Sequence, residues 1–368
     1  MEKDDLLTIL VYVIMFVIAL FIGLRVISPA FGMIDISTEA GKYAYAITSI
    51  LVGAVLNIIL FELGHVIGAK IGGYSILSVN LIGFCFYKSK GKWKFGFRGY
   101  DGLTGETRMI AKKANANPKL HLWGPLLFYI VEFLIAIVLY VVLPDESYFG
   151  HAALIIAGVG GMLIIYNIMP FKLDAMTDGY KLALITKPIN VQAYNELIRI
   201  ESLVYEGEEV TDIKVFDEIT TLTATVNLYR IYELLAQKDF EKADKMLDLM
   251  IENKTKLNEQ TIGRAVAQKL YISLVTKAPE AAEYYWFNVM TTKERKFVAN
   301  DLSLESLRAY LLYSGIVTKS ESECVYVLSR HEKALKREAD KTRKAIEKEL
   351  FDDAFKRVKE KNPDWQFL

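Results

Sequence analysis

The sequence predicts an α-helical polytopic membrane protein of about four spans, followed by a soluble all-α C-terminal domain. Hydrophobic residues make up 52% of the 368-residue chain, and in the first half they form runs long enough to cross a hydrocarbon core of ~30 Å. The second half carries most of the charge, with apolar residues at helical spacing. The 44 basic and 44 acidic residues balance, so net charge gives no indication of nucleic-acid binding.

We expect a membrane domain over residues 1–187. The first run contains one charge, Arg25, near its end. Its length and its acidic N-terminal flank favour a retained span over a cleaved signal peptide. The expected spans are 6–27, 44–69, 122–143 and 152–169.

Basic residues predict the orientation of the spans. The loop at 70–120 contains ten Lys or Arg against two acidic residues, whereas the loops at 28–43 and 144–150 together contain one Lys and no Arg. By the positive-inside rule, the 70–120 loop is cytoplasmic and the other two loops face outward. Both termini are therefore expected in the cytoplasm, and the plasma membrane of a prokaryotic cell is the expected location.

The 70–120 loop is expected to be rich in β-structure. Residues 74–81 and 92–97 alternate apolar with polar side chains, and Lys90-Gly91 lies between them, a pattern typical of a β-hairpin or small sheet. Two interpretations stay open. The basic, aromatic face lies against anionic lipid headgroups, or the hairpin packs on the spans with no further role.

A short motif lies at the cytoplasmic end of the second span. Residues 60–65 read Leu-Phe-Glu-Leu-Gly-His, similar to the helical motif H-E-x-x-H, in which two histidines bind zinc and the glutamate activates a water. Glu62 and His65 match that motif. Phe61 stands in the position of the first histidine.

Later motifs extend the similarity. They are His121 with Gly124-Pro125 at the start of the third span, Asn167 and Pro170 at the end of the fourth, and Asp178-Gly179 beyond it. Together with residues 60–65, and in this order, these motifs resemble the site-2 protease family of intramembrane zinc metalloproteases, over about residues 44–187. The resemblance also implies that the sheet edge in the 70–120 loop holds an extended substrate by strand addition.

The resemblance implies zinc as the cofactor and Glu62 as the general base. His65 and one aspartate are the implied metal ligands. Asp174 follows a leucine, as in the family, whereas Asp178 precedes the expected glycine, and we favour Asp178. His121 is a candidate substitute ligand, against the alternative that it is an ordinary interfacial polar residue.

Five residues are candidates for substrate binding. The resemblance implies this role for Gly124, Pro125, Asn167 and Pro170. Glu132 is added because a carboxylate within a span is costly and usually faces a protein interior or a watery cavity. A neutral, hydrogen-bonded structural role for Glu132 stays open.

Whether we expect catalytic activity depends mainly on Phe61. A phenyl ring has no lone pair for a metal, whereas catalytic zinc normally has three protein ligands and a water. We therefore expect a catalytically impaired pseudoprotease that binds membrane-embedded or extended peptide clients. The alternative is an active intramembrane zinc metalloprotease with a rearranged ligand set. A transporter component or scaffold has only Glu132 in its favour.

The C-terminal half is expected to be cytoplasmic and to recruit a protein partner. Residues 238–247 resemble the second helix of a tetratricopeptide repeat, and residues 278–285 are a weaker echo. We expect an α-helical, repeat-like domain over 188–328 and a charged, solvated helix within 329–368. The two cysteines, Cys85 and Cys324, lie far apart, and we expect unpaired thiols.

Overall fold

The computed structural model of this protein divides the chain into two compact units, Met1–Val191 and Gln192–Leu368. The division falls a few residues beyond the expected boundary at 187/188, and helix α7 (Pro188–Glu206) runs across it. Each unit is considered by itself. The described residues are 3–89, 91–97, 105–113, 116–173 and 176–365.

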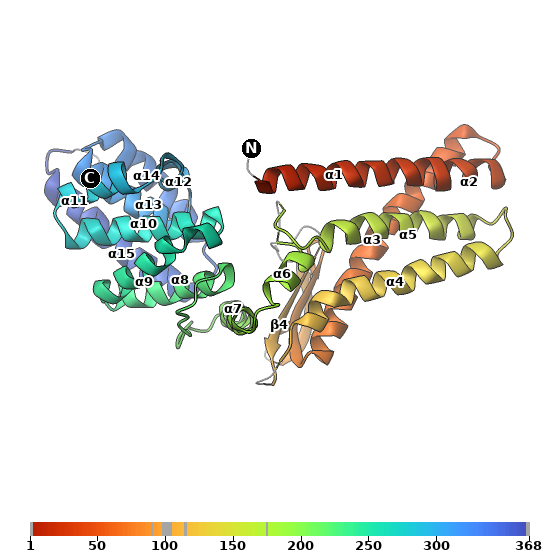
Figure 1. Cartoon of the computed structure of the whole chain (residues 1–368), viewed down its shortest axis with the longest axis horizontal. Helices are drawn as coiled ribbons and strands as arrows, with labels where there is room; N and C mark the ends of the chain where they lie inside the picture. Colours follow the sequence, from red (N-terminus) through yellow and green to blue (C-terminus); the bar gives the residue numbers. More distant parts are fainter. Residues whose placement is uncertain (1–2, 90, 98–104, 114–115, 174–175, 366–368) are drawn as a thin grey trace. The chain divides into compact units, whose positions relative to one another are not determined.

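The first unit contains four helices that are long and apolar enough to cross a membrane (Figure 1). This confirms the expected apolar helices. The first is made of α1 (Lys3–Ile22), a π-helical turn (Gly23–Ile27) and α2 (Ser28–Met33), and the others are α3 (Glu39–Ile71), α4 (Lys119–Val142) and α5 (Tyr148–Asn167).

The polar loop expected at 28–43 was too long. Helix α2 continues to Met33, and α3 begins at Glu39. Pro29 follows the π-helical turn, and the helix continues through it because Ile27 and Ser28 both have right-handed helical backbone angles. Thr38 caps α3 by accepting a hydrogen bond from the Gly41 amide at 3.1 Å. These local signals extend the helices into sequence that composition alone marks as a loop.

Glycines allow α3 and α4 to cross at close range. A Cβ on Gly64 would lie 2.6 Å from the Gly124 carbonyl carbon, and a Cβ on Gly68 would collide with the Leu120 carbonyl oxygen. Side chains at these positions would force the backbones apart. The crossing lies at the end of α3 that leads into the sheet (Figure 1).

The loop between α3 and α4 forms a four-stranded antiparallel sheet in the order β3-β2-β1-β4. Two of its strands were predicted with these bounds, and two were missed. The turn expected at residues 90–91 falls between β2 and β3, and residue 90 is outside the described residues. The strands are β1 (Tyr74–Leu81), β2 (Phe84–Ser89), β3 (Lys92–Phe97) and β4 (Gly105–Ala111).

A β-bulge divides β1. Ile76 pairs with Met109 and Ser78 pairs with Arg108, so Leu77 is an extra residue with no partner in that ladder. Beyond the bulge, Val79 lies opposite Thr107. Because successive side chains point to opposite faces, one face of the sheet carries Thr107 at one edge. The same face carries the exposed rings of Phe84, Phe86, Phe95 and Phe97 on β2 and β3.

The second unit is all α-helical. Its largest buried cluster is formed mainly by apolar side chains of α8, α9, α10, α13 and α15. Ala243 and Leu247, expected on one helical face, are both fully buried. The helices after α7 are α8 (Thr221–Ala236), α9 (Phe240–Glu252), α10 (Glu259–Thr276), α11 (Pro279–Tyr284), α12 (Thr292–Asn300), α13 (Leu304–Leu312), α14 (Glu321–Arg337) and α15 (Lys341–Lys361).

The charged C-terminal segment differs from the solvated helix that we expected. It contains the end of α14 and all of α15, separated at a point where Asp340 caps α15. Leu350, Ala354 and Val358 recur every four residues and are buried against the core. The many Lys and Glu residues on the other faces obscured this apolar stripe in the sequence.

Candidate functional site

The motif of residues 60–65 lies in the second half of α3, toward the end that is expected in the cytoplasm. Phe61 and His65 lie one turn apart, a spacing that places them on the same helical face. Phe61 is only 8% exposed and Glu62 only 5%. The phenyl ring therefore fills buried space in the position where the family motif has its first metal ligand.

Glu62 is held by strand β4. The Thr107 hydroxyl donates a hydrogen bond of 2.6 Å to Glu62 Oε2. A Cβ on Gly105 would lie 2.7 Å from Glu62 Oε1, so the β4 backbone passes directly over the carboxyl group. Thr107 was not predicted, because the sequence predicted no strand over residues 105–111.

His65 and His121 face each other across the α3–α4 crossing. The Nδ1 atom of His65 lies 2.9 Å from the His121 carbonyl oxygen, and the Nδ1 atom of His121 lies 3.1 Å from the His65 carbonyl oxygen. The ring centroids are 4.5 Å apart. Because carbonyl oxygens only accept hydrogen bonds, each Nδ1 must donate, and this fixes both imidazole rings.

Asp178 completes the cluster. Its Oδ2 atom lies 3.2 Å from His65 Nε2 and accepts a hydrogen bond of 2.6 Å from the Asn167 side-chain amide. The Asp178 backbone amide donates to Asn167 Oδ1 at 3.1 Å. Asp178, favoured from the sequence, thus lies beside His65. Asp174, the alternative, is outside the described residues.

Local sequence signals determine where α5 ends at Asn167 and where the next helix begins at Asp178. Helix α5 ends at Asn167, before Pro170, and Thr177 caps the short helix α6 (Asp178–Leu184). A Cβ on Gly179 would collide with the Ile168 carbonyl oxygen. The Asp-Gly pair therefore combines a polar side chain with the only residue small enough for this contact.

The charge of Asp178 is maintained inside the protein. Burial opposes ionisation, because desolvation favours the neutral form of a carboxyl group. His65, Lys181 and the Asn167 amide outweigh burial and hold the pKa of Asp178 well below its usual range. The Lys181 ammonium lies 3.9 Å from Asp178 Oδ1. Asp178 is therefore a carboxylate at neutral pH.

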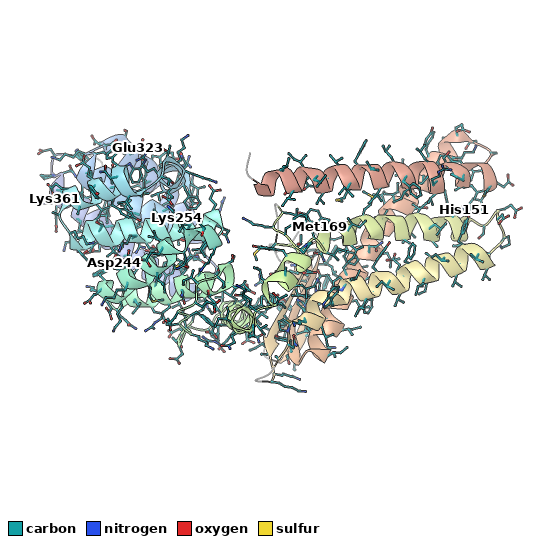
Figure 2. All side chains as sticks on the ribbon, in the orientation of Figure 1. His151, Met169, Asp244, Lys254, Glu323 and Lys361 are labelled. Carbon is teal, nitrogen blue, oxygen red and sulfur yellow. The ribbon has the colours of Figure 1, made fainter. Side chains whose placement is uncertain are left out.

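Several expected residues lie elsewhere. Gly124 and Pro125 are buried against Gly64 of α3, and Pro170 is exposed. Glu132 lies about 16 Å along α4 from His121, given the helical rise. Its carboxyl oxygens are buried without a hydrogen-bond partner of good geometry in the described part of the chain. Figure 2 shows His151 near one end of the helices and Met169 near the other.

Within the described part of the site, two candidate zinc ligands, His65 and Asp178, lie close together. Among the described residues, no three His, Cys, Asp or Glu side chains are grouped so that they could hold a metal. The 3.2 Å separation of His65 and Asp178 suits a direct ion pair, and it also suits two ligands of a tetrahedral zinc ion at ~2.0 Å. The distance between His65 and Asp178 therefore does not distinguish an ion pair from a pair of metal ligands. The distinction depends on how many side chains can donate a lone pair to a metal, and Phe61 has no such atom.

No protein-family model, curated protein or solved structure matches this chain.

Proposed function

We propose that this protein is a membrane-embedded pseudoprotease of the site-2 protease type, which binds peptide clients without cleaving them. One observation carries the proposal: the phenyl ring of Phe61, which stands where the family motif has its first histidine, is buried. Replacing a nitrogen donor by a hydrocarbon removes one of the three protein ligands that catalytic zinc normally has. Glu62, the general base of the family, then has no metal-bound water to deprotonate.

The contacts of His65 and Asp178 support a structural role for what is left of the motif. His65 Nδ1 donates to a backbone carbonyl, and with Nε2 directed at the Asp178 carboxylate both ring nitrogens carry hydrogen. An imidazolium ring has no lone pair for a metal. The pair therefore links α3 to α6 by charge, a role that needs no zinc.

Client binding is supported by strand β4. Thr107 of β4 contacts Glu62, and β4 has a neighbouring strand on one side only within the described sheet. The open edge presents backbone N–H and C=O groups that an extended peptide can pair with. A client segment released from a helix would thus be held beside the inactive motif.

The proposal includes a location and a partner. The Lys and Arg asymmetry between the loops supports cytoplasmic termini in the plasma membrane of a prokaryotic cell. The second unit, with its similarity to tetratricopeptide repeats, would then recruit a cytoplasmic protein to the bound client.

An active zinc protease with a rearranged ligand set is the second candidate. The proximity of the His121 ring to the His65 ring favours it. Since the His121 Nδ1 donates to the His65 carbonyl, its Nε2 is the remaining ring nitrogen, an arrangement common in histidine ligands of metals. His121, His65 and Asp178 would then be the three donors.

Zinc content of the purified full-length chain separates the two candidates. We expect little zinc in the wild type, because losing one of three ligands costs several kcal/mol out of the ~10–16 kcal/mol of a complete site. The Phe61→His variant should approach about one zinc per chain. Adding Asp178→Ala to that variant should remove the metal again.

The His121→Ala variant provides the opposing test. Stoichiometric zinc in the wild type that is lost on His121→Ala would overturn the pseudoprotease proposal in favour of the rearranged site. A Glu132→Gln variant is the matched control, because this carboxyl group lies within α4 but away from the cluster. Its zinc content should equal that of the wild type.

A further inference from the structure

A basic hollow lies where α3 runs into the sheet. It encloses about 450 Å³ and is lined chiefly by Lys70, Lys88, Lys112, Lys113, Tyr74 and Trp93. We call it the lysine pocket. Lys70 comes from the last turn of α3, Lys88 from β2, and the other two lysines from the segment after β4. Residues distant in sequence thus bring four positive charges to one small volume.

The backbone conformation at Gly73 helps to position the lysines of the pocket. Gly73 has a φ of +93°, a conformation that strains residues with a side chain. The Lys112 amide donates to the Gly73 carbonyl at 2.9 Å. A Cβ on Gly73 would lie 3.5 Å from the Lys113 side chain. The turn out of α3 therefore positions two of the four lysines.

Among the described residues, no acidic side chain balances the charges of the lysine pocket. Its lining, within the described residues, contains no Asp or Glu, and none of the four lysines forms an ion pair with another described residue. The Lys88 ammonium lies 5.7 Å from the centre of the Trp93 ring, a cation–π contact that leaves its charge in place. The C-terminus of α3 supplies only about half a negative charge.

The depth of the lysine pocket matches a membrane surface. Lys70 is the first Lys or Arg after the apolar length of α3, so in a bilayer it marks the level of the headgroups. Tryptophan is also enriched at this level. Four cations and an indole ring at a bilayer surface match the charge and shape of an anionic lipid headgroup.

We propose that the lysine pocket binds a phosphate-bearing group, carried either by an anionic lipid or by a soluble phosphate ester. The proposal does not depend on the proposed function. Lysine ammonium groups bind phosphate oxygens as point charges, and the nearby Tyr74 and Trp93 rings close the hollow on its sheet side.

Titration of the full-length chain in detergent tests this proposal. The probes are dioctanoyl phosphatidylglycerol, dioctanoyl phosphatidylcholine and glycerol 3-phosphate, and the measurement is the heat of binding. We expect saturable binding of phosphatidylglycerol, and binding of phosphatidylcholine that is weaker by about tenfold or more, because only the former has a net negative charge. Glycerol 3-phosphate binding as tightly as phosphatidylglycerol would identify a soluble ester as the ligand. Weaker binding would identify the lipid.

Two pairs of variants distinguish a specific binding site in the lysine pocket from non-specific attraction of an anionic lipid to the basic loop. Lys112→Gln with Lys113→Gln should weaken phosphatidylglycerol binding by about tenfold or more, since each lysine near an anionic surface contributes roughly fivefold. Lys92→Gln with Lys94→Gln is the matched control, because these exposed lysines alternate with Trp93 and so point to the other face of β3.

The control pair should change the affinity by less than about twofold. Equal losses in both pairs, or no loss in either, would overturn the proposal, as would no saturable binding of any phosphate probe. Circular dichroism of each variant should match the wild type, and Lys70→Gln provides an independent change in the same pocket.

Discussion

One buried carboxylate in each unit, Asp178 in the first and Glu305 in the second, stays charged because cationic and polar donors replace the water that it loses. Asp178 has His65 and Asn167 as such neighbours in the first unit. Glu305 in the second unit is only 1% exposed. It contacts Arg343 at 2.7 Å and Arg264 at 3.1 Å. In each case, removing the donors would leave a charge without solvation, which is more costly than the net gain from forming the pair.

The first prediction concerns Glu305 and acid stability. Burial raises the pKa of Glu305, but Arg343 and Arg264 outweigh it and lower the pKa to about 2. A carboxyl group with a depressed folded-state pKa stabilises the fold above its unfolded pKa, and this stability is lost as the pH falls through the folded value. We expect on the order of 3 kcal/mol to be lost between pH ~5 and pH ~2.

Denaturant unfolding of the second unit at stepped pH measures this loss. A Glu305→Gln variant should be less stable near neutral pH and should show a shallower dependence on pH. Equal slopes for the wild type and the variant would show that Glu305 does not control acid unfolding.

The residues of the candidate site differ in how far the sequence predicts them. His65, Asn167 and Asp178 belong to short motifs with fixed spacing, and the structure brings them together. Thr107 could not be found in this way, because its contact with Glu62 depends on which strand lies at the sheet edge. The packing of Gly124 and Pro125 against α3 likewise depends on which helix crosses α3 at Gly64 and Gly68, and the glycine spacing does not identify that helix.

Among the elements, helix α3 is constrained in side-chain size at two positions. Its glycines at positions 64 and 68 recur one turn apart and face α4. The close crossing allows the reciprocal hydrogen bonds between His65 and His121. Packing at this crossing therefore controls the geometry of the candidate site as well as the stability of the helices.

The second prediction concerns Gly68. A Gly68→Ala change places a methyl group against the Leu120 carbonyl oxygen, and overpacking of this kind costs about 1–3 kcal/mol. We expect a lower unfolding midpoint for the full-length chain in detergent. Gly32→Ala is the matched control, because a Cβ at that position meets no atom within 4 Å. A midpoint for Gly68→Ala equal to that of the control would contradict the observed crossing.

The strands were harder to predict than the helices. Four long apolar runs identify their helices by length alone, whereas β2 and β4 lack a clear alternation of apolar and polar side chains. Cys85 of β2 is buried between exposed phenylalanines, so apolar residues occur on both of its faces. Strand preference depends on such tertiary surroundings more than helix preference does.

At the scale of the whole molecule, the third prediction concerns topology. Cysteines introduced at Asp35 and Glu146 should react with an impermeant reagent from outside the cell, and a cysteine at Lys94 should not, because the basic loop is retained in the cytoplasm. Reaction of the Asp35 position only after the cells are opened would sink the proposed orientation.

The native cysteines provide an internal control for that experiment. Cys85 and Cys324 are both buried, and neither forms a disulfide. Burial raises the pKa of Cys324 to about 12, so little reactive thiolate exists at neutral pH. Intact wild-type protein should therefore take up almost no reagent.

The fourth prediction concerns independent folding of the second unit. Residues 188–368 have their own apolar core, and a fragment that begins at Pro188 keeps helix α7 whole. Such a fragment should express in water as a folded, helical protein with cooperative thermal unfolding. An insoluble product, or one without helical circular dichroism, would show that this unit requires the first unit in order to fold.

The bulge at Leu77 has a consequence for how this gene can tolerate deletions. In a strand, losing one residue turns every later side chain to the opposite face. Loss of the codon for Leu77 would remove only the unpaired residue, so Ile76 and Ser78 would become neighbours and β4 could keep its partners from Ser78 onward. Loss of the codon for Val79 or Asn80 would instead shift the pairing and turn side chains to the opposite face. Loss of a codon between β2 and β3 would spare the ladder between β1 and β4. Related genes should therefore vary in length between β2 and β3 and at the bulge, and keep a constant length across residues 78–81.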